Sequence, residues 1–415
     1  MHLPEKFRVK DGRLELNEDA PHPSRQNEVV KLIKNVYGLA DASYTWHMHV
    51  KRGLLSCGFR QSQVDPCLFY KNNMLFILYV DDAICLTPDK SKADQLISDL
   101  QKLGYALTDE GSMSAYLGLQ VNWLKDGRVS LTQPAFIERI INSCKLKDQR
   151  MHDTPADNIL SRDSNGLPRK NEFHYRSVIG QLSYLAATTR PEIQFAVHQC
   201  ARFSQDPKMV HEKAVKRIVR YLKRTPDKGL ILSVDKTKGI ECYVDADFAG
   251  GFSKTNATNP RDCLSRTGYV VKYAGCPIVW TSKMQTLIAL STTEAEYLAL
   301  STAMREVIFL MHLMDEMGSF GVQLLQTDKP VIKVNVYEDN VGAIELAKLP
   351  KLRPRTKHIG IQFHHFRSWT TKGINGEEPR VSVQHISTQQ QQADIFTKPL
   401  ARQQFQNLRL LLCGW

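Results

Sequence analysis

The sequence predicts an α/β protein of two or three domains whose C-terminal half holds one mixed β-sheet. At 415 residues the chain is too long for a single hydrophobic core of typical size. From Gly239 onward, strand-like and helix-like segments follow in the order β-β-β-α-β-α-(α)-β-α, which is typical of an α/β layer. Earlier in the chain, two apolar runs within residues 76–86 flank Asp81 and Asp82, and this pattern predicts a buried β-hairpin.

The composition favours a polyanionic partner and a reducing compartment. Lys and Arg outnumber Asp and Glu by 55 to 43, a formal charge of +12, for which nucleic acid is the first candidate partner. The nine cysteines are scattered, with no Cys-x-x-Cys pair and no His spacing suited to zinc. No apolar run approaches the roughly 20 residues that span a bilayer, and the start does not resemble a signal peptide. We expect the protein to work in the cytosol or nucleus, without a membrane.

In chain order, the N-terminal half predicts loops, a small sheet and helices. Residues 1–26 are polar and contain several prolines, which favours loop. Apolar residues recur at helical spacing through Trp46 and again at 91–103, after the hairpin. The remaining elements are strands at 116–121 and 128–131, which bracket an Asp-Gly turn, and a helix at 135–144.

A linker and three helices are predicted next. Residues 147–171 are rich in Asp, Asn, Pro and Ser without a period and are interpreted as a linker. The helices lie at 175–187, 192–203 and 211–224, and the last has one apolar face and one cationic face. The cations are Lys213, Lys216, Arg217, Arg220, Lys223 and Arg224. Such charges repel one another unless anions neutralise them, so this is either a solvated face or one that contacts the phosphates of a duplex.

The C-terminal half supplies the elements of the mixed sheet. Strands are predicted at 240–245, 268–273, 331–337 and 380–386, with more strand within 277–290. Helices are predicted at 292–313, 340–348, 359–369 and from residue 390 onward.

The pair Asp81 and Asp82 admits two interpretations. Asp tolerates left-handed backbone and bonds its own main chain, so turn chemistry alone explains it. Alternatively, two carboxylates at the tip of a rigid hairpin hold Mg²⁺ for phosphoryl transfer. The residue types do not separate these interpretations, and the context must decide.

A second set of acids lies where strands end or helices begin: Asp245, Glu294, Asp339 and Asp394. Each has a structural alternative, because Asp339 can cap a helix, residues 291–294 form a capping-box pattern, Asp245 can be a turn residue and Asp394 a first-turn charge. Strand ends and helix starts can also converge at one edge of a sheet. Four carboxylates there would repel one another, and two Mg²⁺ ions would relieve the repulsion and activate a water against a phosphodiester.

Residues 79–82, Tyr-Val-Asp-Asp, resemble the active-site hairpin of the reverse transcriptases of copia-type LTR retrotransposons. Other segments also resemble the polymerase of this family: 36–39, 58–59, 65–69 and 116–118. Further segments resemble the part of the family that connects the polymerase to its ribonuclease H domain: 175–180, 189–191 and 217–222. Five segments resemble motifs of the family's ribonuclease H domain and follow in the same order: 245–250, 291–297, 338–340, 355–359 and 393–398. The resemblance covers nearly the whole chain.

The resemblance implies roles for the acids. Asp81 and Asp82 become polymerase metal ligands, and the ribonuclease H metal ligands become Asp245, Glu294, Asp339 and Asp394. It implies two Mg²⁺ or Mn²⁺ ions at each site and the same β-β-β-α-β-α-β-α order of elements. The chain lacks the family's third polymerase aspartate, so we expect it to begin inside the palm, and Phe248 replaces a usual Trp. The loop His of many ribonucleases H stays unassigned, because His385 belongs to a predicted strand.

We therefore expect a truncated polymerase palm with thumb-like elements at 1–150, a linker and helical connection at 151–235, a ribonuclease H-like domain at 236–402 and a tail at 403–415. The expected partners are RNA–DNA hybrid, template–primer and, if the polymerase is completed, dNTPs, in the cytoplasm (virus-like particle) or nucleus. One rival is a catalytically dead nucleic-acid-binding remnant, and another is an α/β protein whose carboxylates only cap and turn.

Overall fold

The computed structural model describes residues 7–10, 13–16, 35, 38–146, 150–163, 165–252, 259–322, 332–349, 358–373 and 376–415. Parts of two family-like motifs, at 36–37 and 355–357, lie outside these residues. The chain forms two compact units, Met1–Asp109 and Glu110–Trp415. The division between them falls inside the segment 1–150.

Two short strands, β1 (Phe7–Lys10) and β2 (Arg13–Leu16), pair antiparallel near the N-terminus. The expectation of loop is therefore wrong for these two segments. The missed signal in the sequence is the pair Asp11 and Gly12 between two runs that alternate apolar and charged residues, because Asp-Gly favours tight hairpin turns.

The first unit holds the predicted hairpin in a four-stranded sheet of order β3-β4-β5-β6. Its elements are α1 (Ala42–Ser56), β3 (Arg60–Gln61), β4 (Leu68–Lys71), β5 (Met74–Tyr79), β6 (Asp82–Leu86) and α2 (Lys90–Lys102). Alternate side chains of β5 are buried in one core with apolar residues of α1 and α2. Strand β6 lies at the edge of the sheet and buries none of its side chains. The hairpin is confirmed, but only one of its strands is buried.

A second sheet joins segments that are far apart in the sequence. It has the order β10-β9-β8-β7, with β7 (Ala115–Tyr116), β8 (Leu119–Trp123), β9 (Val129–Thr132) and β10 (Leu230–Leu232). The single strand expected at 116–121 is divided, because Leu117 and Gly118 both have positive φ angles, 50° and 76°. The pairing of β9 with β10 places this hairpin in the second unit.

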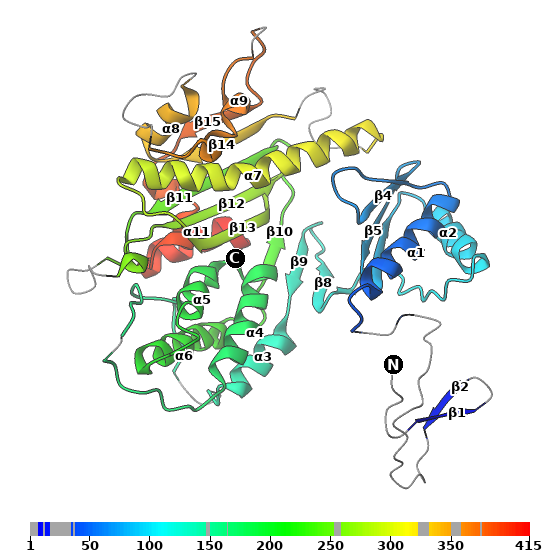
Figure 1. Cartoon of the computed structure of the whole chain (residues 1–415), viewed down its shortest axis with the longest axis horizontal. Coiled ribbons are helices and arrows are strands. Elements are labelled where there is room, and N and C mark those ends of the chain that lie inside the picture. The colour runs from blue at the N-terminus through cyan, green and yellow to red at the C-terminus, as the bar shows by residue number, and fades with distance from the viewer. Residues whose placement is uncertain are drawn as a thin grey trace. The chain divides into compact units, whose positions relative to one another are not determined.

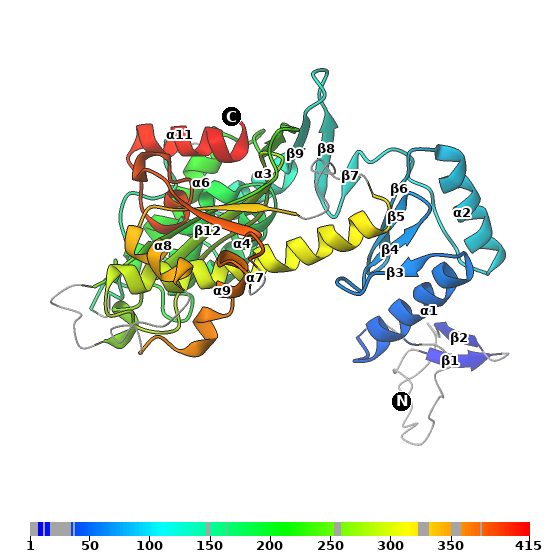
Figure 2. The ribbon, with the colours of Figure 1, turned by 90° about the horizontal axis from the view of Figure 1, so that it is seen from above.

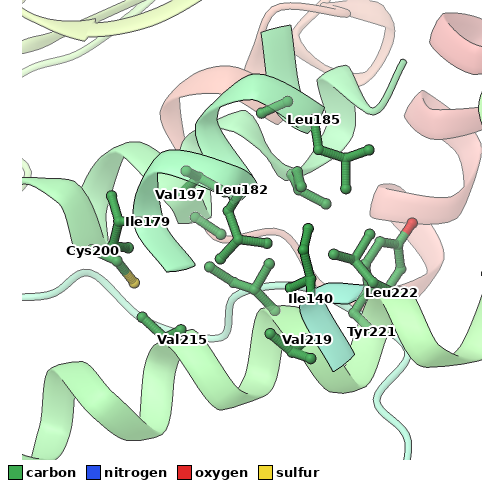
Figure 3. Close-up of a cluster of buried hydrophobic side chains, with 14 of the residues drawn as sticks. Ile140, Ile179, Leu182, Leu185, Val197, Cys200, Val215, Val219, Tyr221 and Leu222 are labelled. Carbon is green, nitrogen blue, oxygen red and sulfur yellow. The ribbon is translucent and has the colours of Figure 1, made fainter. Parts of the chain in front are cut away.

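One group of helices in the second unit, here called the connecting helices, shares a large core, part of which Figure 3 shows. They are α3 (Pro134–Ser143), α4 (Tyr175–Thr188), α5 (Gln194–Ala201), α6 (Met209–Arg224) and α11 (Arg402–Cys413), with the 3-10 helix η1 (Pro191–Ile193) before α5. The predicted helices at 135–144, 175–187 and 211–224 are confirmed. The expected tail at 403–415 is instead mostly the helix α11, whose Phe405, Leu408 and Leu412 are buried in this core.

The predicted mixed sheet has five strands in the order β13-β12-β11-β14-β15. They are β11 (Ile240–Asp247), β12 (Arg266–Tyr273), β13 (Cys276–Met284), β14 (Val334–Glu338) and β15 (Val381–His385). Strand β12 pairs antiparallel with β11 and β13, while β14 lies parallel to both β11 and β15. Helices α7 (Thr292–Ser319), α8 (Val341–Lys348), α9 (Arg367–Thr370) and α10 (Asp394–Thr397) complete the expected order of elements.

Helices cover both faces of this sheet (Figures 1 and 2). Along β11, Cys242 and Val244 are buried in a core with α7 and α8, whereas Tyr243 between them belongs to the core of the connecting helices. Helix α7 is long and apolar enough to cross a membrane by length and composition alone, but it is mostly buried against β11 and β12, so packing explains its apolar sequence.

The C-terminal residue, Trp415, anchors the end of α11 to the segments that contain Gly229 and Arg190. The indole N–H of Trp415 donates to the Gly229 carbonyl at 2.6 Å, and its ring lies 4.0 Å from the Arg409 guanidinium and 5.2 Å from that of buried Arg190. Aromatic rings attract such cations most when both are shielded from water. The last residue is therefore part of the fold.

We expect Trp415→Ala to lower the free energy of unfolding by about 3 kcal/mol, because it removes a packed ring and its hydrogen bond. Leu410→Ala is the control, since that side chain is exposed on α11, close to Trp415 in the sequence, and it should change stability by less than about 0.5 kcal/mol. Urea unfolding of the full chain measures both. Equal stability of the two variants would contradict the anchoring role.

Candidate metal centre

Asp245 lies in the middle of a close packing between β11 and α10. It is 1% exposed and pairs in register with Gly268 on β12. A Cβ atom at residue 268 would lie 2.6 Å from the Thr397 side chain and 2.8 Å from that of Phe396. Glycine therefore lets α10 approach the sheet beside Asp245. There the Thr397 hydroxyl donates to one Asp245 oxygen, and the Lys398 ammonium lies 3.2 Å from the other.

Asp339 reaches the same edge of the sheet because β14 runs parallel to β11. It follows the last residue of β14, and its Oδ2 accepts a hydrogen bond from the Thr388 hydroxyl at 2.9 Å. Thr388 begins the short 3-10 helix η6 (Thr388–Gln390), which comes after β15. His385 lies on β15, as predicted, and is exposed.

Glu296 completes a group of three carboxylates. One oxygen each of Asp245, Glu296 and Asp339 lie within 4.8 Å of one another. Glu296 is 7% exposed, and its Oε2 has no hydrogen-bond partner among the residues that the structure describes. Burial, and then repulsion from Glu338, Asp245 and Asp339, raises the pKa of Glu296 to about 11. The Lys398 ammonium opposes this rise only in part, so the positive charge present does not let all three acids ionise together.

Glu294, the glutamate chosen from the sequence, is not among the three converging carboxylates. Its backbone N–H donates to the Ser291 hydroxyl at 3.2 Å, while its Oε2 accepts from the Leu290 N–H at 2.8 Å and lies 3.1 Å from His358 Nε2. Glu294 thus caps α7, which was the structural alternative for residues 291–294. Glu296, two residues further along α7, is the glutamate that enters the carboxylate group. The signal that points to it is an acid within an otherwise buried run of the helix.

Asp394 joins the centre through a lysine. It is 2% exposed at the start of α10, and the Lys398 ammonium lies 2.9 Å from its Oδ1. Burial, then repulsion from Asp245, raises the pKa of Asp394 to about 7, although Lys398 opposes this. A further acid, Glu338, was not foreseen: it is fully buried, and the pKa of its carboxyl is raised, mainly by burial. The centre is thus five carboxylates and one ammonium.

The hairpin of the first unit presents Asp81 and Asp82 to solvent. Tyr79 pairs with Asp82, so Val80 and Asp81 form the turn between β5 and β6. Val80 has a φ of 54°, which is strained for a β-branched residue, and its carbonyl accepts from the Trp46 indole at 2.6 Å. Within the parts of the chain that the structure describes, no third His, Cys, Asp or Glu gathers with these two aspartates. The turn is fixed, but it supplies only two carboxylates.

The cationic face of α6 is largely balanced within the chain. Lys216 pairs with Glu172 and Glu212, at 2.6 and 3.0 Å, and is well covered. On the same face, Arg217 pairs with Asp157 at 2.7 Å and Arg224 with Asp153 at 2.9 Å. The acids at 153, 157 and 172 come from or border the predicted linker, which therefore lies against this helix. Phosphate contact by this face remains a prediction.

The predicted contact between α6 and phosphates can be tested at the most exposed cations of this helix, Lys213 and Arg224. We expect Lys213→Gln with Arg224→Gln to weaken hybrid binding for all sequences and to flatten the slope of log affinity against log salt by up to about 0.9 per lost contact. Fluorescence anisotropy at several salt concentrations measures the slope, and Lys236→Gln, an exposed lysine outside the helix, is the control. An unchanged slope would assign the face to solvent.

Comparison with known proteins places the chain in a family. Residues 20–158 match the family model described as reverse transcriptase (RNA-dependent DNA polymerase). The chain is 33% identical over 388 residues to the retrovirus-related Pol polyprotein from transposon RE1 of Arabidopsis thaliana. The matched region covers 92% of this chain and 25% of the relative. It is 31% identical over 395 residues to the corresponding polyprotein from transposon TNT 1-94 of Nicotiana tabacum, covering 92% and 28%.

A shorter relative is the putative transposon Ty5-1 protein of Saccharomyces cerevisiae, 27% identical over 285 residues that cover 67% of this chain and 90% of the relative. The match to a solved structure of the foamy viral protease-reverse transcriptase in complex with double-stranded DNA covers 85% of this chain and 52% of that chain, at 11% identity and a TM-score of 0.18. The chain spans about a quarter of the length of the polyproteins from RE1 and TNT 1-94. It belongs to the reverse transcriptase family of copia-type retrotransposon Pol polyproteins.

Proposed function

We propose that the second unit carries a divalent-metal-dependent ribonuclease that cuts the RNA strand of RNA–DNA hybrids, in a chain that also carries a reverse transcriptase region. One observation carries the proposal: oxygens of Asp245, Glu296 and Asp339 lie within 4.8 Å of one another at one edge of the five-stranded sheet. Three separate elements, β11, α7 and the end of β14, hold these side chains. A cap or a turn needs no such convergence.

The residues fit a hard divalent cation. Carboxylate oxygens are the ligands that Mg²⁺ and Mn²⁺ prefer, and the buried Glu296 Oε2 has no partner among the described residues. When bound, such an ion would stabilise negative charge on a phosphodiester and lower the pKa of a water. Asp245, Glu296 and Asp339 would hold it. This revises the ligand set inferred from the sequence, because Glu296 replaces Glu294 and Asp394 is not among the three converging acids.

Neighbouring side chains orient the proposed ligands. The Thr397 hydroxyl fixes one oxygen of Asp245, and the Thr388 hydroxyl fixes one oxygen of Asp339. Hydrogen bonds of this kind hold a carboxylate in one orientation, which matters because ligand geometry controls metal affinity. Glu296 has no such bond on its Oε2, so this oxygen is the one most available to a ligand.

The choice of hybrid as substrate follows from the family. Reverse transcription pairs new DNA with its RNA template, and the same chain carries a region that matches the reverse transcriptase family, at residues 20–158. The formal charge of +12 supports binding of a polyanion. Asp81 and Asp82 are proposed as two of the metal ligands of the polymerase. Its substrates would be a template–primer and dNTPs.

A second candidate is a nucleic-acid-binding remnant without catalysis. It is favoured by the ion pairs of Lys398, which already balance part of the charge at Asp245 and Asp394. In that case the chain would bind hybrid in a salt-dependent manner and cut nothing.

The experiment is cleavage of a labelled hybrid by the full chain in Mg²⁺. The full chain is needed because α11 and β12 share a core with the connecting helices. We expect cleavage of the RNA strand that stops with EDTA and falls by orders of magnitude in Asp339→Asn, while Ser291→Ala, a cap variant, loses about 0.5–2 kcal/mol of stability and keeps the chemistry. A folded parent that binds hybrid and never cuts would favour the remnant.

A further inference from the structure

Lys398 places a positive charge inside the carboxylate centre. Its ammonium lies 2.9 Å from Asp394 Oδ1 and 3.2 Å from Asp245 Oδ1, so it bridges two carboxylates that are nearly fully buried. Two features of the fold bring the ammonium between these two carboxylates. The lysine follows α10 and is four residues from Asp394, and the close approach at Gly268 brings α10 to Asp245.

Asp245 therefore belongs to two groups at once. With Glu296 and Asp339 it forms the three-carboxylate group, and with Asp394 it holds the ammonium. A carboxylate shared in this way can lie between two cations, one on each side. In this structure the Lys398 side chain provides the cation on the Asp394 side.

We infer that Lys398 is a tethered cation that occupies the second cation position of the centre, between Asp245 and Asp394, so that the substrate-free chain binds one divalent ion. A second ion is admitted only when the lysine withdraws. This inference rests on the proposed metal centre, and it concerns the number of ions rather than their presence.

The exposure of Lys398 makes withdrawal physically reasonable. Its side chain is 33% exposed, whereas those of its partners Asp245 and Asp394 are 1% and 2% exposed. The ammonium thus reaches the carboxylates from the solvent side, and rotation of a long, flexible side chain can return it to water without moving the backbone. The carboxylates themselves would stay in place.

The alternative is that the lysine is only structural and prevents repulsion between the two acids. Both roles predict that removing the ammonium destabilises the metal-free chain, because two buried acids lose their partner. Only the tethered-cation role predicts a change in how many divalent ions bind. The number of bound ions is therefore the deciding measurement.

The test is Mn²⁺ binding to the full chain, measured by the electron paramagnetic resonance signal of free Mn²⁺. All proteins carry Asp81→Asn and Asp82→Asn, which removes the other candidate ligands from the count. We expect one ion in this parent, two ions in Lys398→Gln, and one ion again in Lys398→Arg, which keeps the charge. Lys372→Gln is the matched control, because Lys372 is an exposed lysine paired with Glu378 in the same unit.

The outcomes separate this inference from the proposed function. Two ions of similar affinity in the parent, or one ion in a folded Lys398→Gln, would overturn the tethered-cation role and leave the metal centre standing. If Lys398→Gln fails to fold, the count is made with Lys398→Met, which also removes the charge but keeps the length of the side chain, and the same two outcomes apply. No bound Mn²⁺ in any of the proteins would contradict the metal centre itself, and the role of Lys398 with it. In support, Mn²⁺ should raise the Tm of Lys398→Gln more than that of the parent.

Discussion

Replacing Glu296 by Gln should lower the rate of hybrid cleavage by more than the roughly 10–100-fold that the loss of an outer-shell partner costs. The reason is that Glu296 offers one of the three converging carboxylate oxygens, and a neutral amide supplies less charge to a cation. The matched variant is Glu294→Gln in the same helix. Gln serves equally well at that position of a capping box, so activity and stability should stay close to those of the parent.

The comparison is measured as initial rates of RNA cleavage in Mg²⁺, with circular dichroism to show that both variants are folded. Loss of activity in Glu294→Gln with full activity in Glu296→Gln would restore the assignment drawn from the sequence and contradict the one drawn from the structure. Equal loss in both would leave the two glutamates undistinguished, and the ligand set of Asp245, Glu296 and Asp339 would fail.

The purified chain should not extend a primer. Asp81 is exposed in the turn after β5 and Asp82 at the start of β6, and the described residues supply no third carboxylate beside them. Two carboxylates on one turn do not enclose two ions, because a rigid site draws its ligands from several elements. Incorporation of labelled dNTPs on a template–primer is the assay. Template-directed incorporation by the 415-residue chain that is lost in the Asp81→Asn, Asp82→Asn variant would show this expectation to be wrong.

The sequence predicted elements that have a local period and missed those that depend on distant partners. Helix α6 was found because its apolar residues recur at helical spacing, and β14 because its residues alternate. Strand β10 has only three residues and exists because it pairs with β9, about a hundred residues earlier, so nothing local announces it. The balance of charge on α6 was missed for the same reason, since its acids come from another segment.

The candidate site was predicted in part. Asp245 and Asp339 were found because strand ends meet at one edge of a sheet. The sequence did not separate Glu294 from Glu296, because the two acids lie close together at the start of α7, although their directions differ by roughly 200° around the helix axis. Once Ser291 is known as the N-cap, Glu294 falls where a capping side chain belongs, and Glu296 points elsewhere. The contact of Lys398 with Asp245 joins residues 153 positions apart, which no sequence pattern reveals.

The most direct test of the metal centre is the anomalous scattering of Mn²⁺ in crystals of the full chain. We expect a peak bound by Asp245, Glu296 and Asp339, with Glu294 still hydrogen-bonded to the Leu290 N–H. A peak bound by Glu294, or saturating Mn²⁺ with no peak at these three carboxylates, would contradict the proposed metal centre.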